Sequence, residues 1–120
     1  MAAELTIYEV SSCSTCRKLS ALLADRGVEY EGVEYHETGL TEEQIRDLLD
    51  KAGLRPRDVL RRREPLVAEL GLDDEDALSD DASLITLIAE HPRLLQRPIV
   101  VRGDRALLAR PVDRVLELLD

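Results

Sequence analysis

"LTIYEVSSCSTCRKLSALLADRGVEYEGVEYH", residues 5–36, is the stretch that decides the fold. Residues 5–10 alternate in side-chain character, which is typical of a strand, and they run into a turn of two serines. Residues 14–26 carry leucines at helical spacing and end before a glycine, where helices commonly stop. Residues 28–36 predict a second strand, in which Gly32 indicates a bulge. Two strands joined through one helix by tight connections predict a β-α-β unit with parallel strands.

The middle of the chain predicts helices. Thr41 and Gln44 have the spacing of a capping box, and the apolar stripe that follows predicts a helix over 42–52. Residues 54–96 alternate short helical pieces with breaks, and we expect no strand there.

The C-terminal part predicts two strands and a helix. Residues 97–101 form a short apolar run led by an arginine and a proline, and residues 105–110 predict its hairpin partner. Pro111, as a first helical residue, predicts a last helix over 111–119.

The predicted element order is β-α-β, a block of helices, then β-β-α. With a C-x-x-C motif after the first strand, this order resembles a thioredoxin-like α/β fold that carries a helical insertion over about 41–96. At 120 residues, with no linker or internal repeat, the chain is expected to be a single domain over 1–120.

The composition excludes several classes of protein. No apolar run approaches the roughly 18 residues that span a bilayer, so we expect no membrane association. The N-terminus lacks the basic and apolar segments of a signal peptide, which favours the cytoplasm. The net charge of −9 argues against direct binding of nucleic acid, whose phosphates would be repelled.

The two cysteines are the candidate reactive groups. One C-x-x-C supplies too few ligands for zinc, and His36 and His91 lie far along the chain, so we expect no metal. Cys13 is predicted at a helix N-terminus, where unpaired N–H groups and the helix dipole favour a thiolate, and Arg17 adds positive charge nearby. Cys13 is therefore the predicted nucleophile. Cys16 is either a resolving thiol or a buried packing residue.

Arginines provide a second signal. The run "RPRDVLRRREP" holds five arginines between Arg55 and Arg63, and Arg97 and Arg110 each stand directly before a proline. Arginine side chains match tetrahedral oxyanions in a bidentate way. The simpler interpretation, that surface arginines keep the protein soluble, applies to most of them.

Together these motifs make the chain resemble the glutaredoxin-coupled arsenate reductase family, which also contains the Spx-type transcriptional regulators. The resemblance rests on "TIYEVSSCSTCRKL", "VLRRREPLVAELGL", "HPRLLQRPIVV" and "ALLARPVDRVLELL", and it covers nearly the whole chain. It implies a cysteine surrounded by three arginines that hold the anion, here Cys13, Arg61, Arg97 and Arg110. Arg62 is an alternative for the first arginine, and the Arg97–Pro98 peptide is expected to be cis.

The resemblance implies a mechanism without a bound cofactor. The Cys13 thiolate attacks arsenate or a similar oxyanion, and a second thiol completes the reduction to arsenite. That thiol is either Cys16 or an external one, such as glutathione with glutaredoxin, thioredoxin or another low-molecular-weight thiol. The chain departs from the family pattern at Glu9 and Val10, where well-known members have histidine and asparagine, and an acidic Glu9 close to the thiol would raise its pKa.

Two alternatives remain open at this level. An Spx-type regulator would use a Cys13–Cys16 disulfide as a switch and bind RNA polymerase. A third reading is a family member with thiol-reductase activity and no turnover of arsenate.

Overall fold

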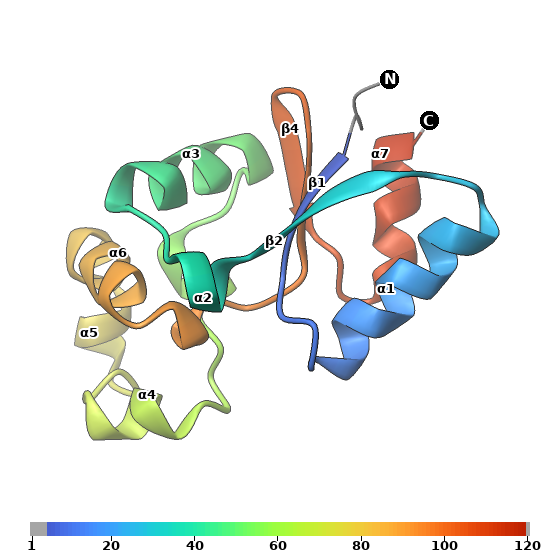
Figure 1. Ribbon diagram of the computed structural model, residues 1–120. Helices are drawn as coiled ribbons and strands as arrows, with labels where there is room; N and C mark the ends of the chain where they lie inside the picture. Colours follow the sequence, from blue (N-terminus) through green and yellow to red (C-terminus); the bar gives the residue numbers. More distant parts are fainter. Residues whose placement is uncertain (1–4, 120) are drawn as a thin grey trace. The chain divides into compact units, whose positions relative to one another are not determined.

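The computed structural model describes residues 5–119, which fall into two compact units (Figure 1). The first unit contains the chain up to Thr38 and from Arg97 onward. The second unit is Gly39–Gln96, nearly the same residues as the expected helical insertion over 41–96.

The first unit is built on one four-stranded sheet. Its strands are β1 (Leu5–Glu9), β2 (Tyr30–Glu34), β3 (Ile99–Arg102) and β4 (Arg105–Leu108). They lie in the order β2-β1-β3-β4, with β2 parallel to β1, β3 antiparallel to β1, and β4 antiparallel to β3. The predicted parallel β-α-β unit and the predicted hairpin are confirmed, and each predicted strand overlaps the observed one.

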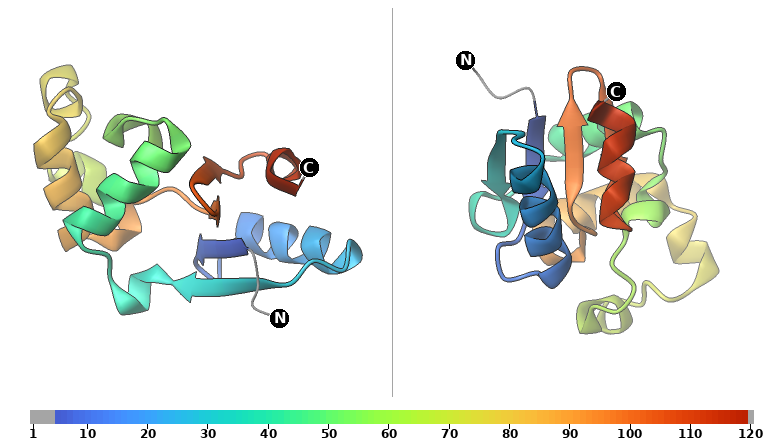
Figure 2. Two further views of the ribbon diagram at one scale, coloured as in Figure 1. Left: turned by 90° about the horizontal axis from the view of Figure 1, so that it is seen from above. Right: turned by 90° about the vertical axis from the view of Figure 1, so that its right-hand side faces the viewer.

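Helices cover one face of this sheet. They are α1 (Ser14–Asp25), the 3-10 helix η3 (Val112–Val115) and α7 (Leu116–Leu119), seen side by side in Figure 2. Their leucines and valines pack against alternate residues of the strands, because side chains one apart on a strand point to opposite faces. The resulting core consists of Leu5, Ile7, Leu19, Leu23, Val100, Leu107, Ala109, Val115 and Leu118.

Three details of the sequence prediction for this unit are wrong. The second strand ends at Glu34, and the next residues form a short helix, α2 (Tyr35–Thr38), which buries Tyr35 completely. A short apolar run does not by itself separate strand from helix, and here burial of Tyr35 decides. Pro111 caps η3 with an extended ψ of 161°, so the last helix begins one residue later and as a 3-10 turn.

The bulge expected at Gly32 is the third wrong detail. Gly32 pairs with Ile7 in an uninterrupted β1–β2 register. A side chain at this position would collide with the Glu9 carboxylate, since an added Cβ would overlap Glu9 Oε2. The glycine therefore makes room for an acidic side chain and does not bend the strand.

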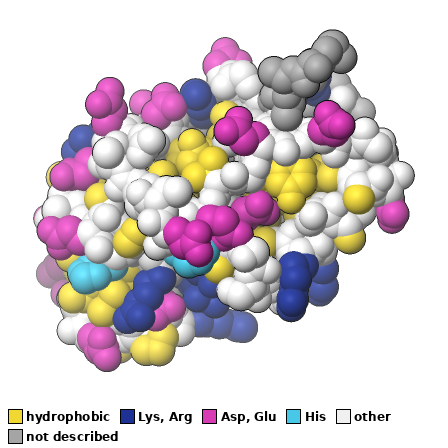
Figure 3. Space-filling model, in the orientation of Figure 1, with side chains coloured by type: hydrophobic (Ala, Val, Ile, Leu, Met, Phe, Trp, Pro, Cys, Tyr) yellow, Lys and Arg dark blue, Asp and Glu magenta, His cyan; other side chains and the backbone are white. Residues whose placement is uncertain are grey.

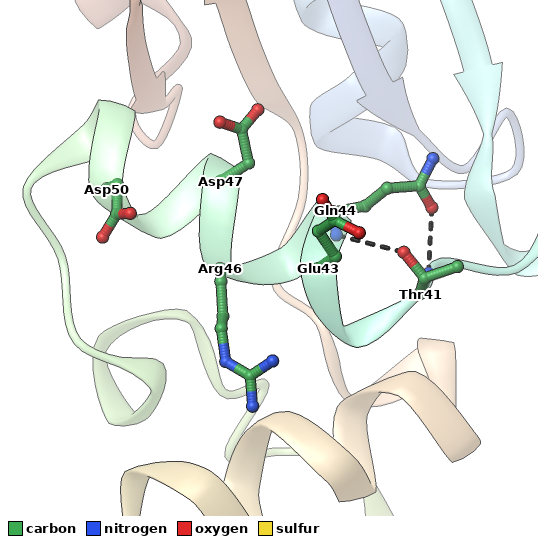
Figure 4. Close-up of a pocket in the computed structure, with 6 residues that line it drawn as sticks. All are labelled: Thr41, Glu43, Gln44, Arg46, Asp47 and Asp50. Carbon is green, nitrogen blue, oxygen red and sulfur yellow. Dashed lines mark hydrogen bonds between the residues drawn. The ribbon is translucent and has the colours of Figure 1, made fainter.

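The second unit is helical, as expected. It contains α3 (Glu42–Ala52), η1 (Pro56–Val59), α4 (Pro65–Glu69), α5 (Glu75–Leu78), α6 (Asp81–Glu90) and η2 (Pro92–Leu94). The predicted capping box is confirmed and is drawn in Figure 4: the Gln44 N–H donates to Thr41 Oγ1 at 3.1 Å, and the Thr41 N–H donates to Gln44 Oε1 at 2.9 Å. Leu60 and Leu95 form an isolated bridge, which is too short to be a strand.

A β-α-β unit followed by an antiparallel hairpin and a helix, with strand order β2-β1-β3-β4, defines the thioredoxin-like fold. The predicted fold class is therefore confirmed. Acidic side chains are spread over the face drawn in Figure 3, in keeping with the net charge of −9. Within residues 5–119, no helix has the length and apolar character needed to cross a membrane.

Candidate active site

Cys13 caps the N-terminus of α1, as the sequence predicts. Its backbone N–H donates to the Val10 carbonyl at 2.9 Å, and its carbonyl accepts from the Arg17 N–H at 3.1 Å, the first bond of the helix. The turn that follows β1 thus delivers the Cys13 sulfur to the end of the helix where backbone N–H groups lack partners.

The surroundings of Cys13 favour its thiolate. Burial by itself raises the pKa of the Cys13 thiol. Hydrogen bonds from the backbone N–H of Cys16, the Arg97 side chain, the Cys16 thiol and the backbone N–H of Thr15 outweigh burial and lower this pKa to about 7. Near neutral pH a substantial share of the protein molecules therefore carries the Cys13 thiolate, the form that acts as a nucleophile.

Cys16 behaves in the opposite way. Its side chain is 2% exposed, and burial raises the pKa of its thiol to about 12, although a hydrogen bond from the Val10 backbone opposes this. The hydrogen bond to Cys13 and the negative charges of Cys13 and Glu9 also contribute to this raised pKa. Cys16 therefore stays protonated and donates its S–H to the Cys13 sulfur.

Glu9 affects the pKa of a different thiol from the one that the sequence suggested. The expectation was that Glu9 would raise the pKa of the reactive thiol. In the structure its charge raises the pKa of Cys16, while the pKa of Cys13 is lowered. The departure from the family pattern at this position leaves Cys13 activated.

Arg97 joins Cys13 from the distant segment before β3. Its side chain is 8% exposed and hydrogen-bonds the Cys13 sulfur. Burial lowers the pKa of Arg97, but interactions with Tyr35 and Cys13 outweigh it and raise this pKa. Among the residues that the structure describes, the buried Nε of Arg97 has no hydrogen-bond partner. A buried donor left unpaired beside a nucleophile is suited to an oxygen of a bound anion.

Tyr35 is a site residue that sequence reasoning missed. The Tyr35 side chain is completely buried and accepts a hydrogen bond from the Arg97 guanidinium. The sequence held no signal for this pairing, because Tyr35 looked like the end of a strand and its partner lies far along the chain.

Arg110 is tied to the backbone of Arg97. Arg110 Nη1 donates to the Arg97 carbonyl oxygen at 2.8 Å, which brings two of the predicted arginines together. The Arg97–Pro98 peptide is cis, as expected, and Arg110–Pro111 is cis as well.

Arg61 belongs to the second unit. There its Nη1 lies 3.3 Å from a Glu64 carboxylate oxygen, and Glu64 also pairs with Arg93. The neighbouring Arg62 is exposed. That Arg61, or Arg62 in its place, completes a trio with Arg97 and Arg110 stays a prediction.

Arg17 is exposed. It lines a small cavity of about 120 Å³ on the Cys16 side of α1. The groups that lower the pKa of Cys13 most are backbone N–H groups, Arg97 and Cys16, so Arg17 is at most a supporting charge.

Other candidate sites are weak. A hollow of about 480 Å³ runs along α3, but its lining side chains do not converge, since Arg46 and Asp47 point in opposite directions (Figure 4). Within residues 5–119, no group of three or more histidine, cysteine, aspartate and glutamate side chains is arranged to hold a metal ion.

A low-pKa cysteine at the start of the first helix, beside a buried arginine in a thioredoxin-like fold, defines a nucleophilic thiol site. The model of the ArsC family matches residues 8–118, and the chain belongs to this family. It is 39% identical over 120 residues to the uncharacterized protein YfgD of Escherichia coli strain K12, with 99% of each chain covered.

Further relatives carry the name arsenate reductase. The chain is 35% identical to the arsenate reductase of Neisseria meningitidis serogroup A, with 97% of this chain and 98% of the relative covered. Its structure is similar to that of an arsenate reductase from Vibrio cholerae, with a TM-score of 0.89, 36% identity and 98% of each chain covered.

Proposed function

We propose that this protein is a thiol-dependent reductase of arsenate or a similar oxyanion. The observation that carries the proposal is the Cys13 thiol, with its pKa of about 7, hydrogen-bonded to the buried guanidinium of Arg97. The relatives named arsenate reductase support arsenate as the substrate.

The first step forms a sulfur–arsenic bond. The Cys13 thiolate attacks arsenic, and one arsenate oxygen leaves as hydroxide, which is protonated to water. Arg97 is suited to neutralise the negative oxygens, since its Nε is buried and unpaired within the described residues. Arg110 and Arg61, or Arg62 in place of Arg61, are proposed as the other anion-binding arginines.

The second step transfers electrons. A second thiolate attacks the Cys13 sulfur, the electron pair of the sulfur–arsenic bond stays on arsenic, and arsenite leaves. The hydrogen bond between Cys16 and Cys13 supports Cys16 as this second thiol, with a Cys13–Cys16 disulfide as the product. An external thiol, from glutathione and glutaredoxin or from a thioredoxin-like protein, would then reduce the disulfide in a reducing compartment such as the cytoplasm. No bound cofactor is needed.

The test is arsenite production. Purified protein, arsenate and either glutathione with glutaredoxin or a thioredoxin system should yield arsenite, measured by separating the two arsenic species. Cys13→Ser should abolish the reaction, because the hydroxyl of serine is not ionised near pH 7.

Cys16→Ser is the matched variant, and it tests whether Cys16 or an external thiol is the second thiol. If Cys16 is the second thiol, this variant should lose turnover with thioredoxin while Cys13 alkylation by iodoacetamide persists. Absence of arsenite with every thiol would contradict the proposal. Capture of RNA polymerase by the oxidised protein would then favour the Spx-type alternative.

A further inference from the structure

The cavity on the Cys16 side of α1 joins a thiol to a carboxylate. It has a volume of about 120 Å³ and is lined by Glu9, Ser11, Cys16, Arg17, Ser20 and Tyr30. A cavity of this size has room for at least one bridging water, because a water molecule needs only about 10–15 Å³ of such space, and Glu9, Ser11 and Ser20 offer it polar partners. Cys16 and Glu9 thus share a small compartment in the first unit.

The Glu9 side chain is directed into this compartment by the sheet. Glu9 lies on the same face of β1 as Leu5 and Ile7, which pack against α1. The absence of a side chain at Gly32 lets its carboxylate extend across the neighbouring strand, and Tyr30 hydrogen-bonds it.

The surroundings of Glu9 raise the pKa of its carboxyl group. Burial, and then the negative charge of Glu34, its register partner on β2, raise the pKa of Glu9 above its ordinary value. The Tyr30 hydrogen bond opposes this shift without reversing it. A carboxylate whose pKa is raised is a stronger base than an exposed one, so it accepts a proton more readily.

Cys16 needs a neighbouring proton acceptor. A thiol that is 2% exposed and that has a pKa of about 12 is almost entirely protonated at pH 7, yet only a thiolate attacks a sulfur atom. Solvent reaches it poorly, so the proton has to leave through a neighbouring group.

We propose that Glu9 accepts the Cys16 proton through the shared cavity when Cys16 attacks the Cys13 sulfur to close the internal disulfide. The inference rests on the internal-disulfide route of the proposed function, but not on arsenate as the substrate. It assigns a role to the residue at which this chain departs from the family pattern.

With a small aromatic disulfide as oxidant, the Cys13–Cys16 disulfide forms in two steps. The Cys13 thiolate attacks one sulfur of the oxidant, which forms a mixed disulfide and releases one aromatic thiolate. Cys16 passes its proton to the Glu9 carboxylate and attacks the Cys13 sulfur. The Cys13–Cys16 bond forms, the second aromatic thiolate leaves with the electron pair, and Glu9 returns the proton to solvent.

The charged groups around Glu9 come from both packed elements. From β2 come Tyr30 and Glu34, and Glu34 accepts hydrogen bonds from the Ser11 N–H and lies 3.4 Å from His36 Nδ1. From α1 come Arg17 and Cys16 itself. Closure rates are therefore compared between variants at the same pH.

The test is stopped-flow oxidation with 4,4′-dithiodipyridine, which releases one coloured thiopyridone at each step. The first phase reports Cys13 and the second reports closure by Cys16; Cys16→Ser should show the first phase only. In Glu9→Gln we expect an unchanged first phase and a second phase slowed by about 10- to 100-fold at pH 7, since proton acceptors contribute factors of this order. Glu31→Gln, an exposed carboxylate on β2 outside the cavity, is the matched control and should close at the wild-type rate.

Whether closure becomes slower or faster in Glu9→Gln shows whether Glu9 accepts the proton. If Glu9 acted only through its charge, its removal would lower the pKa of Cys16 and closure would become faster. Faster or unchanged closure in Glu9→Gln would therefore overturn the proposal. If this variant fails to fold, Glu9→Asp replaces it, with slower closure again expected because the shorter carboxylate withdraws from the cavity. Failure of arsenate turnover would leave the two-phase oxidation unaffected, so the two proposals fail separately.

Discussion

The two cysteines lie one turn apart on the same helix, yet their surroundings have opposite effects. On the Cys13 side, backbone N–H groups and the buried Arg97 lower the thiol pKa to about 7. On the Cys16 side, burial and the charge of Glu9 raise the thiol pKa to about 12. The difference shows that the C-x-x-C segment activates only one of its thiols: the backbone N–H groups of Thr15 and Cys16 and the Cys16 thiol favour the Cys13 thiolate, with Arg97 added from outside the motif, whereas burial and Glu9 keep Cys16 protonated.

The largest expected effect tests the cationic side. In Arg97→Gln we expect arsenate turnover to fall by about 100- to 1000-fold, the usual cost of removing one donor to a developing negative charge. The pKa of Cys13 should also rise, because the mutation removes a hydrogen bond to its thiolate. Turnover and the pH dependence of iodoacetamide alkylation measure the two effects.

Arg105→Gln is the matched control for this change. It removes the same charge from an exposed arginine on β4, whose Nη2 donates to the Glu117 carbonyl oxygen at 3.2 Å. An equal loss in both variants would mean that overall charge, and not the hydrogen bond to Cys13, matters.

A smaller loss of turnover is expected for a change at Tyr35, which acts on Cys13 through Arg97. Tyr35→Phe removes the hydroxyl that accepts from Arg97 and leaves the ring in place. We expect a loss of turnover of about 10-fold, since a hydrogen bond to a charged group contributes about 1.5 kcal/mol. Because Tyr35 acts through Arg97, Cys13 alkylation should shift to higher pH in the same variant.

Tyr8→Phe on β1 is the comparison for Tyr35→Phe. It should leave both the turnover and the pH dependence of alkylation unchanged. A shift of equal size in Tyr8→Phe would indicate a general loss of packing and contradict the positioning role of Tyr35.

The smallest expected effect is that of Glu9 on the folding stability of the protein. The pKa of Glu9 is raised by folding, first by burial and then by the charge of Glu34. As pH rises from about 4, the unfolded chain releases this proton before the folded protein does, so ionisation of Glu9 disfavours folding. This cost is absent below the unfolded pKa and complete above the folded one.

Glu9→Gln should therefore be more stable than the wild type at pH 7 and should lose this advantage near pH 4. Thermal unfolding of both proteins at the two pH values measures the difference. A Tm advantage that is the same at pH 4 and pH 7, or a lower Tm at pH 7, would contradict the raised pKa of Glu9.

Local patterns were enough to predict elements of both units. The helix N-terminus at Cys13, the capping box at Thr41 and the parallel β-α-β unit depend on residues that are neighbours in the chain, and all three are confirmed. The predicted end of the second strand was wrong, because the burial of Tyr35 depends on tertiary packing that local sequence does not show.

The sequence by itself determined that Cys13 would begin a helix and meet its unpaired N–H groups, because helix capping is a short-range property. The tertiary structure alone decided that Arg97 and Tyr35 reach that sulfur, and that Glu9 acts on Cys16 and not on Cys13. Arg97 and Tyr35 come from segments that are far from Cys13 in the chain. Glu9 is close to Cys16 in sequence, but the direction in which a strand points its side chains is settled only when the sheet and helix pack together.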